Sequence, residues 1–266
     1  MKLKYLMILG AVTAAIAACG NSKLNDKYAD SSVVSMEKNA LGDTTVYGLA
    51  CDGSTDSVVV VLKYSGGDPD TFNILNAMRM HQVFGRVKIG DELAIILDAD
   101  NKKEVDMMVD LDELKGSWCY KVMPHMRDIA GMPKRMQQMM QKHMPDSMMQ
   151  SLMVPREYGF KLKRDFQSSP IGYVQHNAST DDMSPVEYPT LKWYNEWRIY
   201  NGKLILTQNT TKMMVDKKDR KVINDTAEIL LLRRDTLALK FHDGKVIGYY
   251  NKDKAQLKHG MGIPKK

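Results

Sequence analysis

Short apolar runs separated by turn residues fill most of this chain, and this spacing limits the fold more than any other feature. The runs are bounded by Gly, Asn, Asp and Ser, which is typical of consecutive β-strands. Asn201-Gly202 and Asp243-Gly244 are strong signals for tight hairpins. Only one segment has a sustained helical pattern, so the sequence predicts an all-β fold.

The apolar runs form two series, which predict two small antiparallel β-barrel or sandwich domains over residues 44–110 and 111–252. The first series favours a small barrel, with an OB-like fold as one option, and has expected strands at Thr44–Ala50, Ser57–Tyr64, Thr71–Leu75, Val83–Ile89, Glu92–Leu97 and Val105–Val109. The second series predicts an up-and-down barrel of about eight strands. Its expected strands are Leu114–Tyr120, Tyr158–Arg164, Ile171–His176, Leu191–Tyr200, Leu204–Gln208, Ala227–Leu232, Thr236–Phe241 and Val246–Tyr250.

The second series also resembles a known family. It opens with Leu114, Gly116 and Trp118 at alternate positions, and it continues with Trp197 and the Asn201-Gly202 turn. These features are similar to those of lipocalin-like lipoproteins from gut Bacteroidota, over about residues 111 to 251. The resemblance implies a lipocalin-like barrel in which Trp118 is structural, and it supplies no catalytic residues.

A Met-rich segment interrupts the second series. Ten of the 21 methionines lie between Met123 and Met153, many at helical three- and four-residue spacing. We therefore expect a helical insertion over residues 123–155. In lipocalin-like folds this position lies near the open mouth of the barrel, so the analogy suggests a lid.

The N-terminus has the pattern of an export signal. Lys2 and Lys4 precede a short apolar run, and residues 1–18 are interpreted as a signal peptide. Ile16-Ala17-Ala18-Cys19 resembles the cleavage motif of bacterial lipoproteins, which predicts lipidation of Cys19 with palmitate-type acyl chains. A general signal peptidase site is the alternative. Acylation would hold the protein permanently at a membrane.

The polar segment after the anchor predicts a flexible tether over residues 19–43. It lacks the acidic cluster linked to surface export, which favours an outer-membrane position facing the periplasm, with surface exposure left open. Residues 253–266 form a basic tail, although the formal net charge of +6 is mild for a chain of this length. Together with export, the missing nucleic-acid motif argues against a nucleic-acid partner.

Two cysteines remain once Cys19 is lipidated. In an oxidising compartment Cys51 and Cys119 are candidates for a disulfide, and two separate buried thiols are the alternative.

Three interpretations of the Met-rich segment stay open. Its methionines fill gaps in the protein's own core, or they form an adaptable surface for an apolar ligand or a protein partner, or they bind Cu(I). The candidate ligand or partner surface consists of Met136, Met139, Met140, Met144 and Met148, with Trp193 and Trp197 on a shared strand face. The candidate copper donors are Met123, His125, Met126, His143 and Met144.

The sequence contains no recognisable catalytic motif. It lacks the Gly-x-Ser-x-Gly elbow of serine hydrolases and the His-Glu-x-x-His motif of zinc enzymes. The acidic pairs Asp91/Glu92, Asp112/Glu113 and Asp181/Asp182 are interpreted as solvated loop charges. We therefore expect a non-enzymatic, lipid-anchored envelope protein without a cofactor, which binds a small apolar ligand or a protein partner. A copper-handling lipoprotein and a purely structural envelope protein are the alternatives.

Overall fold

The computed structural model describes residues 42–128, 134–135, 137–138, 152–172, 186–210 and 221–255. All of them belong to one compact unit that spans Asn39–Lys266. The fold is all-β, as the sequence predicts, and its helices are short. Among the described residues, none of the helices has the length and hydrophobicity needed to cross a membrane.

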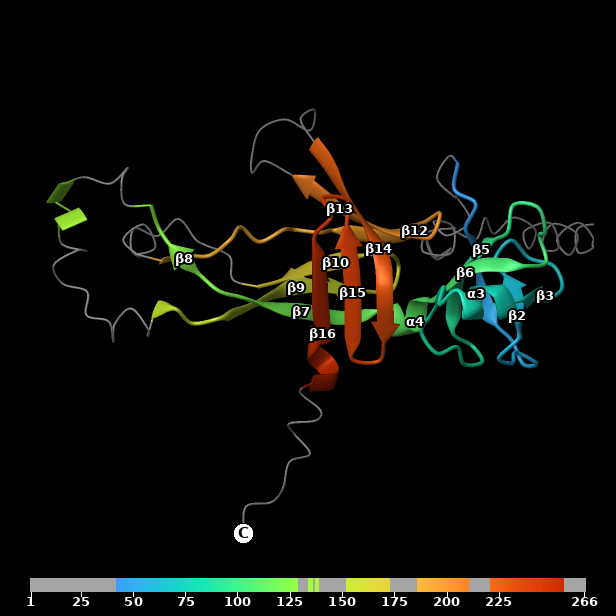
Figure 1. Cartoon of the computed structure of the whole chain (residues 1–266). Helices are drawn as coiled ribbons and strands as arrows, with labels where there is room; N and C mark the ends of the chain where they lie inside the picture. The colour runs from blue at the N-terminus through green and yellow to red at the C-terminus, as the bar shows by residue number, and fades with distance from the viewer. Residues whose placement is uncertain are drawn as a thin grey trace, which may run out of the picture. The chain divides into compact units, whose positions relative to one another are not determined.

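A six-stranded sheet forms the first part of the described chain (Figure 1). Its strands are β1 (Val46–Ala50), β2 (Val58–Lys63), β3 (Asp70–Asn73), β4 (Val83–Phe84), β5 (Glu92–Leu97) and β6 (Val105–Asp110), in the order β3-β2-β1-β5-β6-β4. A parallel bridge between Asn73 and Glu104 connects β3 to the segment before β6. Alternate side chains such as Val59, Val61 and Ile95 are buried in the core of this sheet.

Two predicted strands of this sheet differ from the structure. The expected strand Thr71–Leu75 ends at Asn73 and is followed by the helix α3 (Leu75–Arg79). The expected strand Val83–Ile89 ends after Phe84 because Gly85 has a φ of +96°, which L side chains rarely adopt. A Cβ at Gly85 would lie 2.5 Å from the Cβ of Asp110, so the chain passes directly over that side chain.

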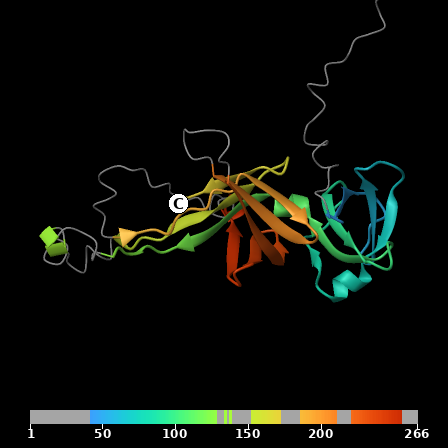
Figure 2. The ribbon, with the colours of Figure 1, turned by 90° about the horizontal axis from the view of Figure 1, so that it is seen from above.

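The second sheet has eight strands and forms a nearly closed barrel (Figure 2). Its strands are β7 (Gly116–Val122), β9 (Arg156–Leu162), β10 (Ser168–Ile171), β12 (Glu196–Tyr200), β13 (Lys203–Thr210), β14 (Lys221–Arg233), β15 (Thr236–Phe241) and β16 (Val246–Asn251), in the order β10-β9-β7-β16-β15-β14-β13-β12. An antiparallel bridge between Gln167, just before β10, and Glu196 in β12 links the two edge strands of this sheet. The amide of Trp197 also donates a 2.8 Å hydrogen bond to the carbonyl oxygen of Phe166 at this edge.

Large apolar side chains pack against one another inside the barrel. Trp118 is 0% exposed, and its indole Nε1 donates a 2.7 Å hydrogen bond to the carbonyl oxygen of Leu114. Other members of this cluster are Phe160, Leu162, Tyr194, Trp197, Ile199, Leu204, Leu206, Ala227, Ile229, Leu237, Leu239 and Tyr249. The inside of the barrel is therefore occupied by the protein's own core.

The segment predicted as a helical insertion includes extended structure. β8 (His125–Met126) follows β7 closely and pairs with β11 (Val186–Glu187) in a separate two-stranded sheet. Residues 134–135, 137–138 and 152 are helical. The pairing of β8 with β11 joins segments about sixty residues apart, so local periodicity could not reveal it.

The two larger sheets share one hydrophobic core. Phe84, Ala94 and Val109 of the first sheet belong to the same cluster as Trp118 of the barrel. The helix α4 (Leu111–Leu114) connects the sheets, and both of its leucines are buried in this shared cluster. Continuous packing of this kind fixes the two sheets against each other.

Candidate functional site

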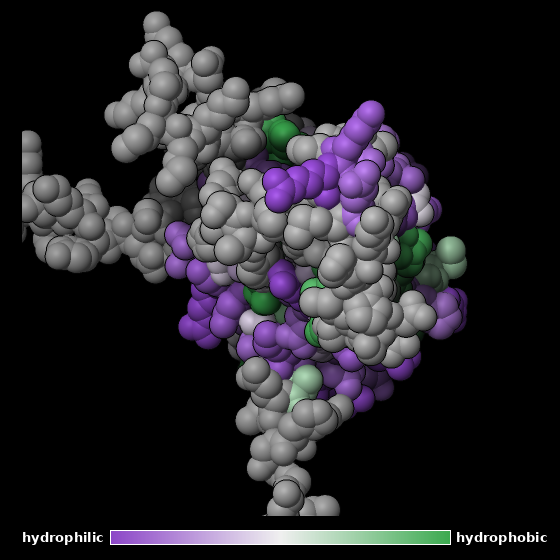
Figure 3. Space-filling model, turned by 90° about the vertical axis from the view of Figure 1, so that its left-hand side faces the viewer, coloured by the Kyte–Doolittle hydropathy of each residue, from purple (hydrophilic) through white to green (hydrophobic). Residues whose placement is uncertain are grey.

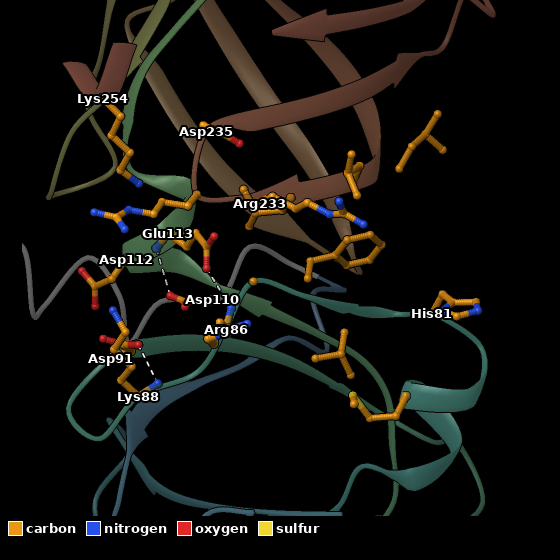
Figure 4. A pocket seen from close by; sticks show the side chains of 18 residues that line it. His81, Arg86, Lys88, Asp91, Asp110, Asp112, Glu113, Arg233, Asp235 and Lys254 are labelled. Atoms are coloured by element: carbon orange, nitrogen blue, oxygen red, sulfur yellow. Dashed lines mark hydrogen bonds between the residues drawn. The ribbon is translucent and has the colours of Figure 1, made fainter. Parts of the chain in front are cut away.

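A cleft of about 1430 Å³ lies where the two sheets meet (Figure 4). One wall comes from α3, β4 and the loop that follows β4, and the other comes from the end of β14 and its turn to β15. α4 and Lys254 also line the cleft. Its volume exceeds the roughly 300–1,000 Å³ of common small-molecule pockets.

The acidic side chains of the cleft hold its loops in place. Glu113 accepts a 2.8 Å hydrogen bond from the backbone amide of Arg86, and Asp91 accepts one of 2.7 Å from the amide of Lys88. Asp112 accepts a 2.7 Å hydrogen bond from the amide of Glu92. These carboxylates therefore fix the shape of the wall between β4 and β5.

Asp110 is the most buried acid of the cleft, at 2% exposure. Its Oδ1 accepts a 3.0 Å hydrogen bond from the amide of Glu113 and caps the start of α4. Burial raises the pKa of Asp110 to about 7, and the charges of Asp91, Glu113 and Asp112 raise it further, while the hydrogen bond from Glu113 opposes the shift.

The cationic side chains of the cleft differ from the acidic ones in their contacts. Within the described part of the chain, none of the five forms an ion pair: Arg86, Lys88, Arg233, Arg234 and Lys254. Burial lowers the pKa of Lys254; the charge of Glu113 opposes this shift, those of Arg234 and Lys88 add to it, and that of Asp235 opposes it. Lys254 is therefore influenced by both the acids and the cations of the cleft.

Apolar side chains line the remainder of the cleft. Met78 is 42% exposed on α3, and Leu230 is 47% exposed on β14. Leu230 sits at a break in the register between β14 and β15, between Ile229 and Leu231. Such a β-bulge changes the direction of a side chain, and here it leaves a large leucine at the cleft rather than in the core.

The sequence-based ligand surface is only partly within the described residues. Met136, Met139, Met140, Met144 and Met148 lie outside them. Trp193 and Trp197 do not share a strand face, contrary to the prediction, because β12 begins only at Glu196. Trp193 is 45% exposed, whereas Trp197 is 1% exposed and belongs to the barrel core, where it offers no surface to a ligand.

The expected disulfide is not formed. Cys51 and Cys119 are both free thiols. Cys51 directly follows β1 of the first sheet, whereas Cys119 lies in β7 of the barrel, where it is fully buried. Burial raises the pKa of the Cys119 thiol to about 11.

Of the candidate copper donors, the structure describes Met123, His125 and Met126. Met123 and Met126 are exposed, and His125 lies in β8 opposite Glu187. His143 and Met144 lie outside the described residues. Within the described ranges, no three His, Cys, Asp or Glu side chains come together in a way that could hold a metal ion.

No local pattern in the sequence predicts the cleft. The pairs Asp91/Glu92 and Asp112/Glu113 were interpreted as separate loop charges, but the hydrogen bond between Asp112 and Glu92 brings them together. Asp181 and Asp182 lie outside the described residues. The closeness of two acidic turns to the Arg233-Arg234 turn depends on contacts between the sheets, for which the sequence has no local signal.

The surface seen from the side of β8 differs from the cleft. Most described residues on this face are hydrophilic, and the hydrophobic ones form small, separate patches (Figure 3).

Comparisons with known proteins give no match: no family model, no curated protein and no solved structure shows significant similarity to the chain.

Proposed function

We propose that the protein is a non-enzymatic, lipid-anchored binding lipoprotein of the cell envelope, and that its ligand occupies the cleft between the two sheets. The observation that carries this proposal is the cleft itself, which lies between walls fixed by a shared core. A preformed site avoids the entropic cost of ordering its walls when a ligand binds.

The proposed ligand site lies outside the lipocalin-like barrel. Buried side chains occupy the barrel interior, whereas the end of β14 contributes its side chains to the cleft outside. The barrel then acts as a scaffold that presents one wall of the site. The lipocalin-like character of this barrel and the anchor at Cys19 are parts of the same proposal.

Native mass spectrometry would test whether the cleft holds a ligand. The form that begins at Gly20 lacks the lipid but retains the whole unit Asn39–Lys266. We expect an additional bound mass after gentle purification from the producing cells, and we expect Leu230→Trp to displace it by narrowing the cleft beside β14. Val246 is 56% exposed and is not part of the cleft lining, so Val246→Trp serves as the matched control.

A bound mass that persists in Leu230→Trp would overturn the assignment to the cleft. The absence of any bound mass in the unaltered form would favour a purely structural protein. The anchor has its own test: the N-terminal peptide should carry acyl chains on Cys19, and Cys19→Ala should leave the protein without them.

A further inference from the structure

Along the chain, both walls of the cleft pass from apolar to charged lining residues. In the first wall, Val83 and Phe84 precede Arg86 and Lys88. The second wall has a run of leucines, residues 230–232, followed by Arg233 and Arg234. β14 lies against β4, so the two walls adjoin along the cleft.

The arrangement of the labelled side chains agrees with this division. In Figure 4, Lys254, Lys88, Asp91 and Asp112 gather at one end, whereas His81 lies at the other end, toward which the side chain of Arg233 extends. Apolar lining residues of that second end include Met78, which lies on α3 near His81. One end of the cleft is therefore mostly charged, and the other end is largely apolar apart from His81 and Arg233.

The charged end of the cleft contains acids, Asp235 among them, and also cations that no ion pair among the described residues engages. Four of its carboxylates already accept hydrogen bonds from backbone amides: Asp91, Asp110, Asp112 and Glu113. Asp112 also forms an ion pair with Lys115. The cationic groups Lys88, Arg234 and Lys254 have no such partners among the described residues. An anion placed among these three would gain charge-assisted hydrogen bonds from them.

We propose that the cleft binds a single-chain lipid with an anionic head group, with the head at Lys88, Arg234 and Lys254 and the alkyl chain along Met78, Val83 and Leu230. The inference deepens the proposed function, on which it rests, by assigning the chemistry of the ligand. Apolar surface on the chain drives its burial, and the cations select the head group.

Calorimetric titration of the form beginning at Gly20 would test this inference, with dodecyl phosphate below its micellar concentration as the probe. We expect saturable binding that neither dodecyltrimethylammonium nor dodecyl maltoside reproduces. Inorganic phosphate carries only the anionic head group. It should bind at least tenfold more weakly than dodecyl phosphate, because it has no alkyl chain to bury. Equal binding of all three alkyl probes would overturn the selection for an anion.

Amino-acid substitutions test whether dodecyl phosphate binds in the cleft. Arg234→Gln with Lys254→Gln should weaken dodecyl phosphate binding at least tenfold, because two charge-assisted contacts are lost. Lys161→Gln with Lys245→Gln removes the same charge from exposed sites outside the cleft and should leave the affinity unchanged. Leu230→Gln should weaken dodecyl phosphate but not inorganic phosphate.

Equal affinities in the cleft pair and the control pair would overturn the inference. Its failure remains distinct from failure of the proposed function. A different class of ligand that is lost in Leu230→Trp would refute the anionic lipid and preserve the binding role. No ligand in the cleft of any class would refute both.

Discussion

The phenol of Tyr47 in β1 donates a 2.6 Å hydrogen bond to the carbonyl oxygen of Ile199 in β12, and so connects the first sheet to the barrel. The ring of Tyr47 also packs edge-on against Phe166, with centroids 5.9 Å apart. Burial raises the pKa of Tyr47, which keeps the phenol protonated as a donor. This contact helps to fix the two sheets, which supply the walls of the cleft, against each other.

Tyr47→Phe should therefore destabilise the protein. The substitution leaves the carbonyl of Ile199 without this donor, which costs about 1–2 kcal/mol. Urea unfolding measures the change. Tyr188 donates a similar 2.7 Å bond to the carbonyl of Val154 at an exposed site, so Tyr188→Phe should cost less. Equal losses in the free energy of unfolding of the two variants would mean that the Tyr47 hydrogen bond contributes no more to stability than the exposed Tyr188 hydrogen bond.

Trp118 and Trp193 should respond very differently to the same substitution. Trp118→Phe removes a fully buried indole and its hydrogen bond to Leu114, and we expect a loss of about 2–4 kcal/mol. Trp193 is 45% exposed, so Trp193→Phe should change stability by only about 0.5 kcal/mol. Thermal unfolding followed by circular dichroism distinguishes the two. A small effect at Trp118 would contradict its structural role.

Two glycines in the barrel strands form a second matched pair. A Cβ at Gly159 in β9 would lie 1.9 Å from the backbone oxygen of Trp118, whereas a Cβ at Gly248 in β16 would meet nothing within 4 Å. Gly159→Ala should therefore prevent the close pairing of β9 with β7 and destabilise by about 3 kcal/mol or more. Gly248→Ala should be neutral or slightly stabilising. The melting temperatures of both variants provide the measurement, and a harmless Gly159→Ala would show that β9 can shift.

Asp110 should make stability depend on pH. Its folded-state pKa of about 7 lies above the ordinary value of 3.8, so the folded chain keeps a proton that the unfolded chain loses as pH rises through this interval. The free energy of unfolding should thus fall by roughly 2–4 kcal/mol between about pH 4 and pH 7. Asp110→Asn retains a capping oxygen and cannot ionise, so its stability should vary less with pH. Urea unfolding at pH 5 and pH 8 tests the difference, and parallel profiles for both proteins would contradict it.

The free thiols should differ in reactivity. Cys119 is buried and its pKa is raised to about 11, so it should resist a thiol reagent at pH 8 in the folded protein. Cys51 is partly exposed and should react first. Both should react after unfolding without prior reduction. A protein that shows no free thiol even in denaturant would support the disulfide that the structure lacks.

Hairpin positions were accessible from sequence because their signals are local. Asn201 and Gly202 adopt φ values of +45° and +78°, as a tight turn between β12 and β13 requires. The same local chemistry predicted the β15–β16 turn at Gly244, where φ is +81°. The alternation of apolar side chains then identified the strands and the all-β class.

Other features depend on partners that are distant along the chain. The short length of β4 follows from the passage of Gly85 over Asp110, and the pairing of β8 with β11 joins separate segments. Trp193 and Trp197 have the spacing of one strand face, yet the late start of β12 leaves the first exposed and the second buried. A pattern that is compatible with a strand does not determine where the strand begins.

The tight turns, the approximate positions of most strands and the all-β class could be predicted from the sequence, because each of these follows from interactions among neighbouring residues. Only the tertiary structure decided that Lys88, Arg234 and Lys254 line one cleft and that Asp110 is buried with a raised pKa. Those properties arise when two sheets pack on a common core, and the desolvation and charge repulsion that follow have no counterpart in the isolated segments.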